Sequence, residues 1–185
     1  HIKEEKIIAP PDYVAVPALQ ALSYSIDSNE IRELYANLIA KAMNVDTSVD
    51  VHPAYIDIIR QLSPLDAVIF NKIAADCKDK NRICLYNINL KLERKVVASY
   101  TNIVNIVYSD APLKDVSQSI DNLMRCGLLA ISNRVFVDFG DIGKEMVNWT
   151  NIMAELKDGM EVEVPWASAA YITGFGKGFY SICCT

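Results

Sequence analysis

Apolar residues recur in the first third of the chain at the spacing of an α-helix. Between residues 27 and 42 they form one continuous stripe: Ile31, Leu34, Leu38, Ile39 and Ala42. Asp27 is placed to cap this helix, and Glu30, three residues later, completes the pattern of a capping box. The sequence therefore predicts a helix over 27–42 that buries a single face.

Prolines mark the starts of three further predicted helices. Pro17, Pro53 and Pro64 each stand where a first helical turn is expected, and a proline fits there because it needs no N–H partner. Ser63, directly before Pro64, is a natural N-cap. We expect helices over about 17–25, from Pro53 to Leu62, and over 64–77.

The second part of the chain mixes both periodicities. Alternating apolar residues indicate strands, and Gly127 is placed as the C-cap of a helix. The predicted elements after residue 77 are a strand over 83–90, helices over 92–107 and 115–126, strands over 128–131 and 135–139, a helix over 141–157, strands within 162–172, and a short helix capped by Thr173.

This order of elements is typical of a winged helix, in which the third helix, here 115–126, is the recognition helix. We therefore expect a mostly α (α+β) fold. A helical N-terminal part over 10–62 would pack on a winged-helix-like part over 63–185, with a small β wing in an extended region over 128–172.

Charge changes this picture, because the chain is acidic overall but contains one basic stretch. The formal net charge is −5 and the isoelectric point is near 5.0. Residues 72–95 nevertheless hold seven Lys and Arg against three Asp and Glu. The basic residues are Lys72, Lys78, Lys80, Arg82, Lys91, Arg94 and Lys95. They could contact a nucleic-acid backbone or an acidic partner, or simply form a charged loop that balances the acidic remainder.

The predicted recognition helix carries polar side chains that suit base edges: Ser117, Gln118, Asn122 and Arg125. Asp115 and Asp121 on the same helix outnumber Arg125, however, so the helix would bring negative charge toward phosphates. Affinity for DNA comes largely from neutralising phosphates with Lys and Arg. A winged helix used for protein contacts therefore fits the charge better than one used for reading DNA.

Catalytic and cofactor motifs are weak in this sequence. His52 is the only internal histidine, and its place in a His-Pro pair at a helix start favours a capping or packing role. Gly174, Gly176 and Gly178 alternate without the spacing of a phosphate loop or a dinucleotide fingerprint. The five cysteines lack metal-binding spacing and indicate reduced thiols. We expect no enzyme, no cofactor and no metal.

Apolar residues make up 51% of the chain, and the mean hydropathy of +0.14 is high for a soluble protein. Several large apolar residues gather in the predicted wing region: Phe136, Phe139, Met146, Trp149 and Trp166. They indicate either ordinary core or a surface that binds protein. No apolar run is long enough for a membrane span, and no signal peptide is evident, so we expect a cytoplasmic protein.

Three stretches resemble a known family. They are Pro10-Pro11-Asp12 with Pro17–Ala21 and Glu30–Ala40, then Val51–Ile59 with Gln61–Ala67, and Ile172–Phe179 with Cys183. These stretches resemble the abortive infection alpha family of bacterial proteins, over nearly the whole chain. The resemblance implies a bacterial intracellular protein associated with phage resistance, and it implies no catalytic residue or substrate.

The favoured hypothesis is a non-enzymatic interaction module of an abortive-infection phage defence protein. It would act through protein contacts, with a protein partner or self-association. The alternative is a winged-helix nucleic-acid-binding protein that uses the basic stretch 72–95.

Overall fold

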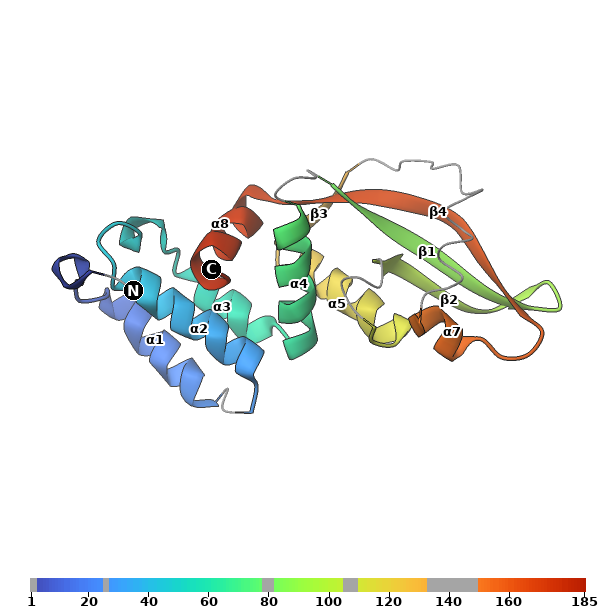
Figure 1. Ribbon diagram of the computed structural model, residues 1–185, viewed down its shortest axis with the longest axis horizontal. Helices are drawn as coiled ribbons and strands as arrows, with labels where there is room; N and C mark the ends of the chain where they lie inside the picture. Colours follow the sequence, from blue (N-terminus) through green and yellow to red (C-terminus); the bar gives the residue numbers. More distant parts are fainter. Residues whose placement is uncertain (1–2, 25–26, 78–81, 105–109, 133–149) are drawn as a thin grey trace.

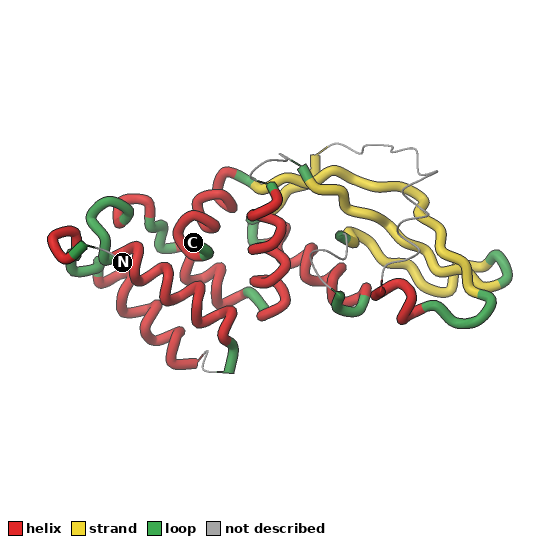
Figure 2. The backbone as a smooth tube through the Cα atoms, in the orientation of Figure 1, coloured by secondary structure: helices red, strands yellow, loops and turns green. Residues whose placement is uncertain are grey.

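The computed structural model describes residues 3–24, 27–77, 82–104, 110–132 and 150–185. The molecule is elongated, with helices gathered at one end and a sheet extending to the other (Figure 1). Both termini of the chain lie at the helical end (Figures 1 and 2). The fold is α+β, as the sequence predicts.

The helical end is built from the first part of the chain and from the last helix. Its elements are η1 (Glu4–Lys6), α1 (Asp12–Tyr24), α2 (Asn29–Ala42), η2 (Ser48–Asp50), α3 (Ala54–Gln61), α4 (Pro64–Asp76) and α8 (Gly174–Cys183). α8 returns from the sheet to pack beside α2, where the Asn37 amide donates to the Cys183 carbonyl at 2.9 Å. The C-terminal helix therefore completes the core of the N-terminal helices.

Two helix starts differ from the sequence prediction. α1 begins at Asp12 instead of near residue 17, so Pro17 lies inside the helix and not in its first turn. α2 is capped by Ser28, whose hydroxyl accepts from the Ile31 N–H at 3.3 Å, and not by Asp27. Adjacent Asp and Ser are both good N-caps, so composition alone does not choose between them.

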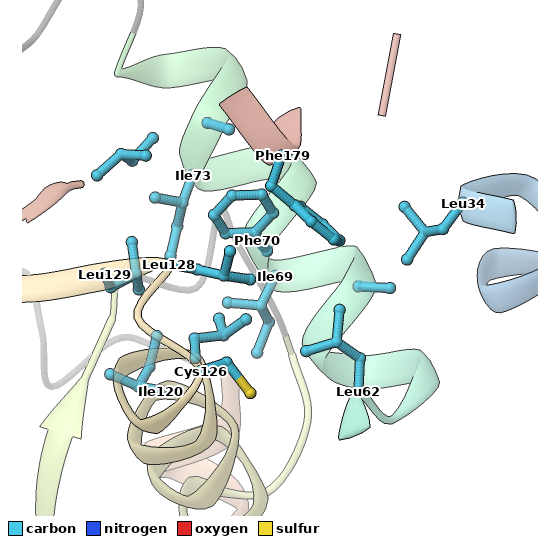
Figure 3. Close-up of a cluster of buried hydrophobic side chains, with 14 of the residues drawn as sticks. Leu34, Leu62, Ile69, Phe70, Ile73, Ile120, Cys126, Leu128, Leu129 and Phe179 are labelled. Carbon is cyan, nitrogen blue, oxygen red and sulfur yellow. The ribbon is translucent and has the colours of Figure 1, made fainter. Parts of the chain in front are cut away.

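α4 begins as predicted and occupies the middle of the molecule. Ser63 and Asp66 form a complete capping box at its start. Ile69, Phe70 and Ile73 of α4 are fully buried. Figure 3 shows these side chains between Phe179 of α8 and residues of the α5 side, including Leu128 and Ile120. α4 is thus the helix that joins the two ends of the protein.

The sheet contains four antiparallel strands in the order β2-β1-β4-β3. The strands are β1 (Ile83–Leu92), β2 (Lys95–Ile103), β3 (Leu129–Ser132) and β4 (Met160–Ile172). β4 is one continuous strand where the sequence predicts shorter pieces. Its pairing with β1 shifts register opposite Pro165, which agrees with the bend expected at that residue.

The helix predicted over 92–107 is wrong, because Leu92 ends β1 and β2 occupies Lys95–Ile103. Residues 105–107 lie outside the described residues. β1 and β2 form a hairpin whose two-residue turn, Glu93-Arg94, has both φ angles positive, +50° and +67°. Val96 and Tyr100 match a helical spacing, but valine and tyrosine also suit a strand. Pairing with β1 decides between the two, and a local pattern does not contain that information.

α5 (Leu113–Arg125) packs against β2 and β3, and α7 (Thr150–Glu155) is joined to β2 by the hydrogen bond from the Tyr100 hydroxyl to Glu155. α5 begins two residues before the predicted Asp115, directly after Pro112. Gly127 caps it as predicted, with φ +72° and bonds from Gly127 N–H to Met124 and from Leu128 N–H to Leu123. The strand predicted over 135–139 and residues 141–149 of the predicted helix lie outside the described residues.

The described elements are not arranged in the order of a winged helix. Between α4 and α5 the chain forms a β-hairpin, where a winged helix has its second helix. A four-stranded sheet also replaces the expected small wing. α5 consequently packs against the sheet and α4, and these neighbours determine the contacts of its polar side chains.

Candidate interaction surface

The polar residues of α5 bond largely to the neighbouring helices. The Asn122 amide donates to the Asp66 carboxylate and to the Gln61 carbonyl, both at 2.8 Å. Arg125 donates to the Gln61 side chain at 2.7 Å and to the Asn122 side chain. These two predicted base-reading residues thus hold α5 against the end of α3 and the start of α4.

Asp66 is the centre of this contact. Its carboxylate is buried, with 3% of the residue exposed, and it accepts from the Ser63 N–H, the Ser119 hydroxyl and the Asn122 amide. A buried carboxylate is stable only when such donors surround it. Of the other predicted residues, Ser117 is half-buried and Gln118 is exposed. The structure therefore does not gather the four predicted residues into one exposed face.

The basic stretch is divided between distant parts of the fold. Lys72 lies on α4 beside Glu30 and Glu33, and Arg82 precedes β1. Lys91, Arg94 and Lys95 lie at the opposite end of β1, a strand of ten residues that spans roughly 30 Å. Lys78 and Lys80 lie outside the described residues.

Acidic residues of β4 stand across from the basic end of the hairpin. Glu161 pairs in register with Lys91, whose ammonium forms an ion pair with Glu163. The hydrogen bond from Lys91, aided by one from Asn89, lowers the pKa of the Glu163 carboxyl. The charges that look like a basic island in the sequence are thus interleaved with acidic ones in the sheet.

A different surface stands out in the structure, on the outer side of α1. The thirteen residues of α1 include a single charged one, Asp12. Its inner side is buried through Val14, Ala18 and Ala21. The outer side exposes four large apolar residues, which we call the α1 strip: Tyr13 (62% exposed), Val16 (51%), Leu19 (55%) and Tyr24 (90%). Asp12, Gln20 and Ser23 are exposed beside them.

A groove of about 730 Å³ adjoins the α1 strip at its Tyr24 end. Ile31 and Ile59 contribute apolar lining, and Arg60 and Tyr35 contribute polar groups. The Arg60 guanidinium lies 3.4 Å from the Asp57 carboxylate and 3.5 Å from the Pro17 carbonyl, and it also bonds to the Tyr35 hydroxyl. Burial raises the pKa of the Tyr35 hydroxyl, so it remains a neutral donor. Strip and groove together form the candidate interaction surface.

Sequence reasoning missed the α1 strip, although a signal was present. A surface helix normally carries charged or polar residues on its outer face, whereas a helix that is apolar all round is buried. α1 has one charge in thirteen residues and yet lies at the edge of the molecule (Figure 1). The apolar residues predicted in the wing fall mostly outside the described residues, and Trp166 is half-buried.

The remaining candidate chemistry has structural roles. His52 Nδ1 accepts from the Ala54 N–H at 3.1 Å and its ring lies 5.8 Å from that of Phe175, so it caps and packs as expected. Burial raises the pKa values of Cys183 and Cys184, to about 12 for Cys184. Within the described ranges, no group of His, Cys, Asp and Glu is arranged to hold a metal ion.

Two of the three glycines of α8, Gly176 and Gly178, allow a close approach of neighbouring atoms. A Cβ at Gly176 would lie 2.2 Å from the Leu128 carbonyl oxygen, and one at Gly178 would lie 2.5 Å from the Tyr55 hydroxyl. The Thr173 hydroxyl caps α8 as predicted and also donates to the Gly127 carbonyl. In the part of the chain that is described, no helix is long and apolar enough to cross a bilayer.

Fold and surface together define a small α+β protein in which several large apolar side chains of one helix are open to solvent. The model of the abortive infection alpha family matches residues 1–183, and the chain belongs to this family. No curated protein matches the sequence. An uncharacterized protein from the hydrocarbon-degrading marine bacterium Alcanivorax borkumensis SK2 has a solved structure that is 12% identical, with a TM-score of 0.38. That match covers 71% of this chain and 92% of the other.

Proposed function

We propose that the chain is a non-enzymatic interaction module in abortive infection, which acts in the cytoplasm by binding protein through the α1 strip. One observation carries the proposal: four large apolar side chains of α1, those of the α1 strip, are half or more exposed to solvent. Monomeric soluble proteins rarely expose large contiguous apolar patches, and where such patches occur they usually mark binding sites. Family membership supplies the biological context.

Charge also supports a protein partner over a nucleic acid. The chain has a formal net charge of −5, and the described basic residues are spread over roughly 30 Å of strand or paired with acids. Nucleic-acid affinity depends on a concentrated set of phosphate contacts. The charge pattern therefore favours a protein partner, bound through apolar side chains, over a nucleic acid.

The test compares two substitutions at equally exposed apolar positions. Leu19→Asp places a charge in the centre of the α1 strip, and Val97→Asp does the same on β2, far from α1. Surface changes of this kind alter stability by about 0.5 kcal/mol or less, so both variants should fold. Circular dichroism and urea unfolding confirm this for each variant.

Tagged wild type and both variants are then recovered from phage-infected bacteria, and phage protection is measured in parallel. We expect Leu19→Asp to lose both the recovered protein and the protection, and Val97→Asp to keep both. Equal behaviour of the two variants would refute the proposal. Salt-sensitive binding of DNA or RNA by the purified chain, unaffected by Leu19→Asp, would favour the nucleic-acid alternative.

A further inference from the structure

We propose that the protein partner of the α1 strip is a basic amphipathic helix, whose apolar stripe covers the strip and whose Lys and Arg lie beside Asp12 and Asp27. This inference rests on the proposed function and states the chemistry of its partner. Exposed apolar side chains flanked by carboxylates are complementary to a helix that carries apolar residues among cations.

The net charge of the chain is confined to its N-terminal helices. Residues 1–71, which include α1, α2 and α3, hold five Lys and Arg against ten Asp and Glu. The remaining residues hold thirteen of each, so their formal charge is zero. The α1 strip therefore lies on the acidic part of the molecule, where a cationic partner is attracted.

Two carboxylates stand at opposite ends of the strip. Asp12 lies one helical turn before Val16, and Asp27 lines the groove beside Tyr24. Both are exposed, and neither forms an ion pair with another described residue. α1 is about 20 Å long, so a partner helix of roughly four turns can place a basic residue at each end.

The backbone of α1 adds hydrogen-bond acceptors along the same surface. Pro17 has no N–H, so the Tyr13 carbonyl lacks the donor that the fourth residue along a helix normally supplies. The negative pole of the helix dipole lies at the Tyr24 end, where the last turn of α1 holds no basic residue. Ammonium and guanidinium groups suit both places, because they bring several N–H donors together with positive charge.

The existing cation at this surface is already paired. Among the described residues of the strip and the groove, Arg60 is the only cation. Its guanidinium forms an ion pair with the Asp57 carboxylate at 3.4 Å, so these two charges balance. Asp12 and Asp27 therefore remain as the net charge that a partner meets.

The size of the surface determines how strongly a partner can bind. One face of α1 is about 20 Å long and about 10 Å wide, so the strip alone offers about 200 Å² to a partner. The groove of about 730 Å³ extends the contact onto α2 and α3, where Ile31 and Ile59 line a space for an apolar side chain. Stable interfaces bury about 800 Å² on each side, so we expect a salt-dependent complex with a dissociation constant on the order of 100 μM.

Two synthetic peptides of about fourteen residues test the inference against the purified full chain. Both carry the same leucine stripe at helical spacing, and the other positions are Lys in one peptide and Glu in the other. Each is titrated into the isotope-labelled chain at low salt, and the shifts of the α1 resonances are followed by NMR. We expect the Lys peptide to bind on the order of 100 μM and the Glu peptide to bind at least about tenfold more weakly.

Charge reversal identifies the carboxylates responsible. Asp12→Lys combined with Asp27→Lys should reverse the preference, so that the Glu peptide binds more tightly than the Lys peptide. Asp110→Lys combined with Asp158→Lys makes the same change in net charge at exposed positions after β2 and after α7, and should keep the wild-type preference. Equal binding of both peptides by the wild type, or a preference for the Lys peptide that survives the change at Asp12 and Asp27, overturns the inference.

Failure of this inference is distinguishable from failure of the proposed function. Leu19→Asp and the Asp12→Lys, Asp27→Lys variant are both recovered from phage-infected bacteria. If only Leu19→Asp loses the recovered protein, the strip binds a protein that is not basic, and this inference alone fails. If neither variant loses it, the proposed function fails as well. A wild type that binds neither peptide, but dimerises through Leu19 or floats with phosphatidylglycerol vesicles, also rejects the basic partner.

Discussion

At the scale of single residues, two positions are the most sensitive to substitution. At one an added side-chain atom has no space, and at the other a buried carboxylate needs all of its hydrogen-bond donors. Gly176 lies against the backbone of Leu128, which cannot move aside as a side chain can. Asp66 gathers donors from Ser63, Ser119 and Asn122. The sequence marks Gly176 as part of an alternating-glycine motif and places Asp66 in the first turn after the Ser63 cap, but it does not reveal their distant partners.

Gly176→Ala should destabilise the protein strongly, because the added Cβ would lie 2.2 Å from the Leu128 carbonyl oxygen. We expect a loss of about 3 kcal/mol in the free energy of unfolding, the upper part of the range for overpacking. Gly174→Ala is the matched control, since a Cβ there has no atom within 4 Å, and it should be neutral or slightly stabilising. Urea unfolding measures both, and similar values for the two variants would contradict the packing described for α8.

Asp66→Asn should loosen the contact between α4 and α5, because an amide places an N–H₂ group among three donors. We expect a loss of about 2–4 kcal/mol in the free energy of unfolding. Asp115→Asn on the exposed side of α5 serves as the control, with a change of about 0.5 kcal/mol or less. A mild effect of Asp66→Asn would mean that α5 does not depend on this carboxylate.

At the scale of elements, local signals predicted the starts and ends of several helices well. The Ser63 cap, the Thr173 cap and the Gly127 C-cap are all present, because each depends on residues within a few positions. β2 was mistaken for a helix because its stabilising partner is β1, and apolar spacing alone fits both structures. The strands β1, β3 and β4 were predicted in part, and β2 is the described strand that sequence reasoning assigned wrongly.

The hairpin gives a direct test of this correction. Glu93 and Arg94 both adopt positive φ, which costs roughly 1–2 kcal/mol per residue for side chains of this kind. The double substitution Glu93→Asn with Arg94→Gly suits a two-residue hairpin turn and should raise the free energy of unfolding by about 1–2 kcal/mol. In a helix the same glycine would lower it by about 1 kcal/mol. The sign of the change in urea unfolding therefore decides between strand and helix.

Glu155 of α7 joins three elements, since its carboxylate accepts from the Tyr100 hydroxyl of β2 and the Leu113 N–H of α5. The hydrogen bond to Glu155, followed by burial, raises the pKa of Tyr100 to about 12. An unfolded tyrosine titrates near pH 10, so the contribution of Tyr100 is complete below about pH 10 and is lost as the pH rises toward 12. The stability difference between wild type and Tyr100→Phe should shrink across this window in urea unfolding. A difference that stays constant with pH would contradict the role of this hydrogen bond.

At the scale of the whole molecule, the fold separates charged residues that are neighbours in the sequence, and it determines which apolar residues stay exposed. The basic stretch 72–95 is continuous in sequence, but β1 separates its ends, and Glu161 and Glu163 of β4 meet the hairpin end. These acids lie about seventy residues further along the chain, so only the sheet brings them near. The α1 strip was equally hidden, because composition shows that a helix is apolar but not which side remains uncovered.

The central claim is that the α1 strip is a protein contact surface, and photo-crosslinking in intact bacteria tests it most directly. A photoreactive amino acid is placed at Leu19 in one variant and at Val97 in another, two positions of similar exposure. The account predicts a discrete protein adduct from position 19 and none from position 97. No adduct from position 19, or equal adducts from both positions, would contradict it.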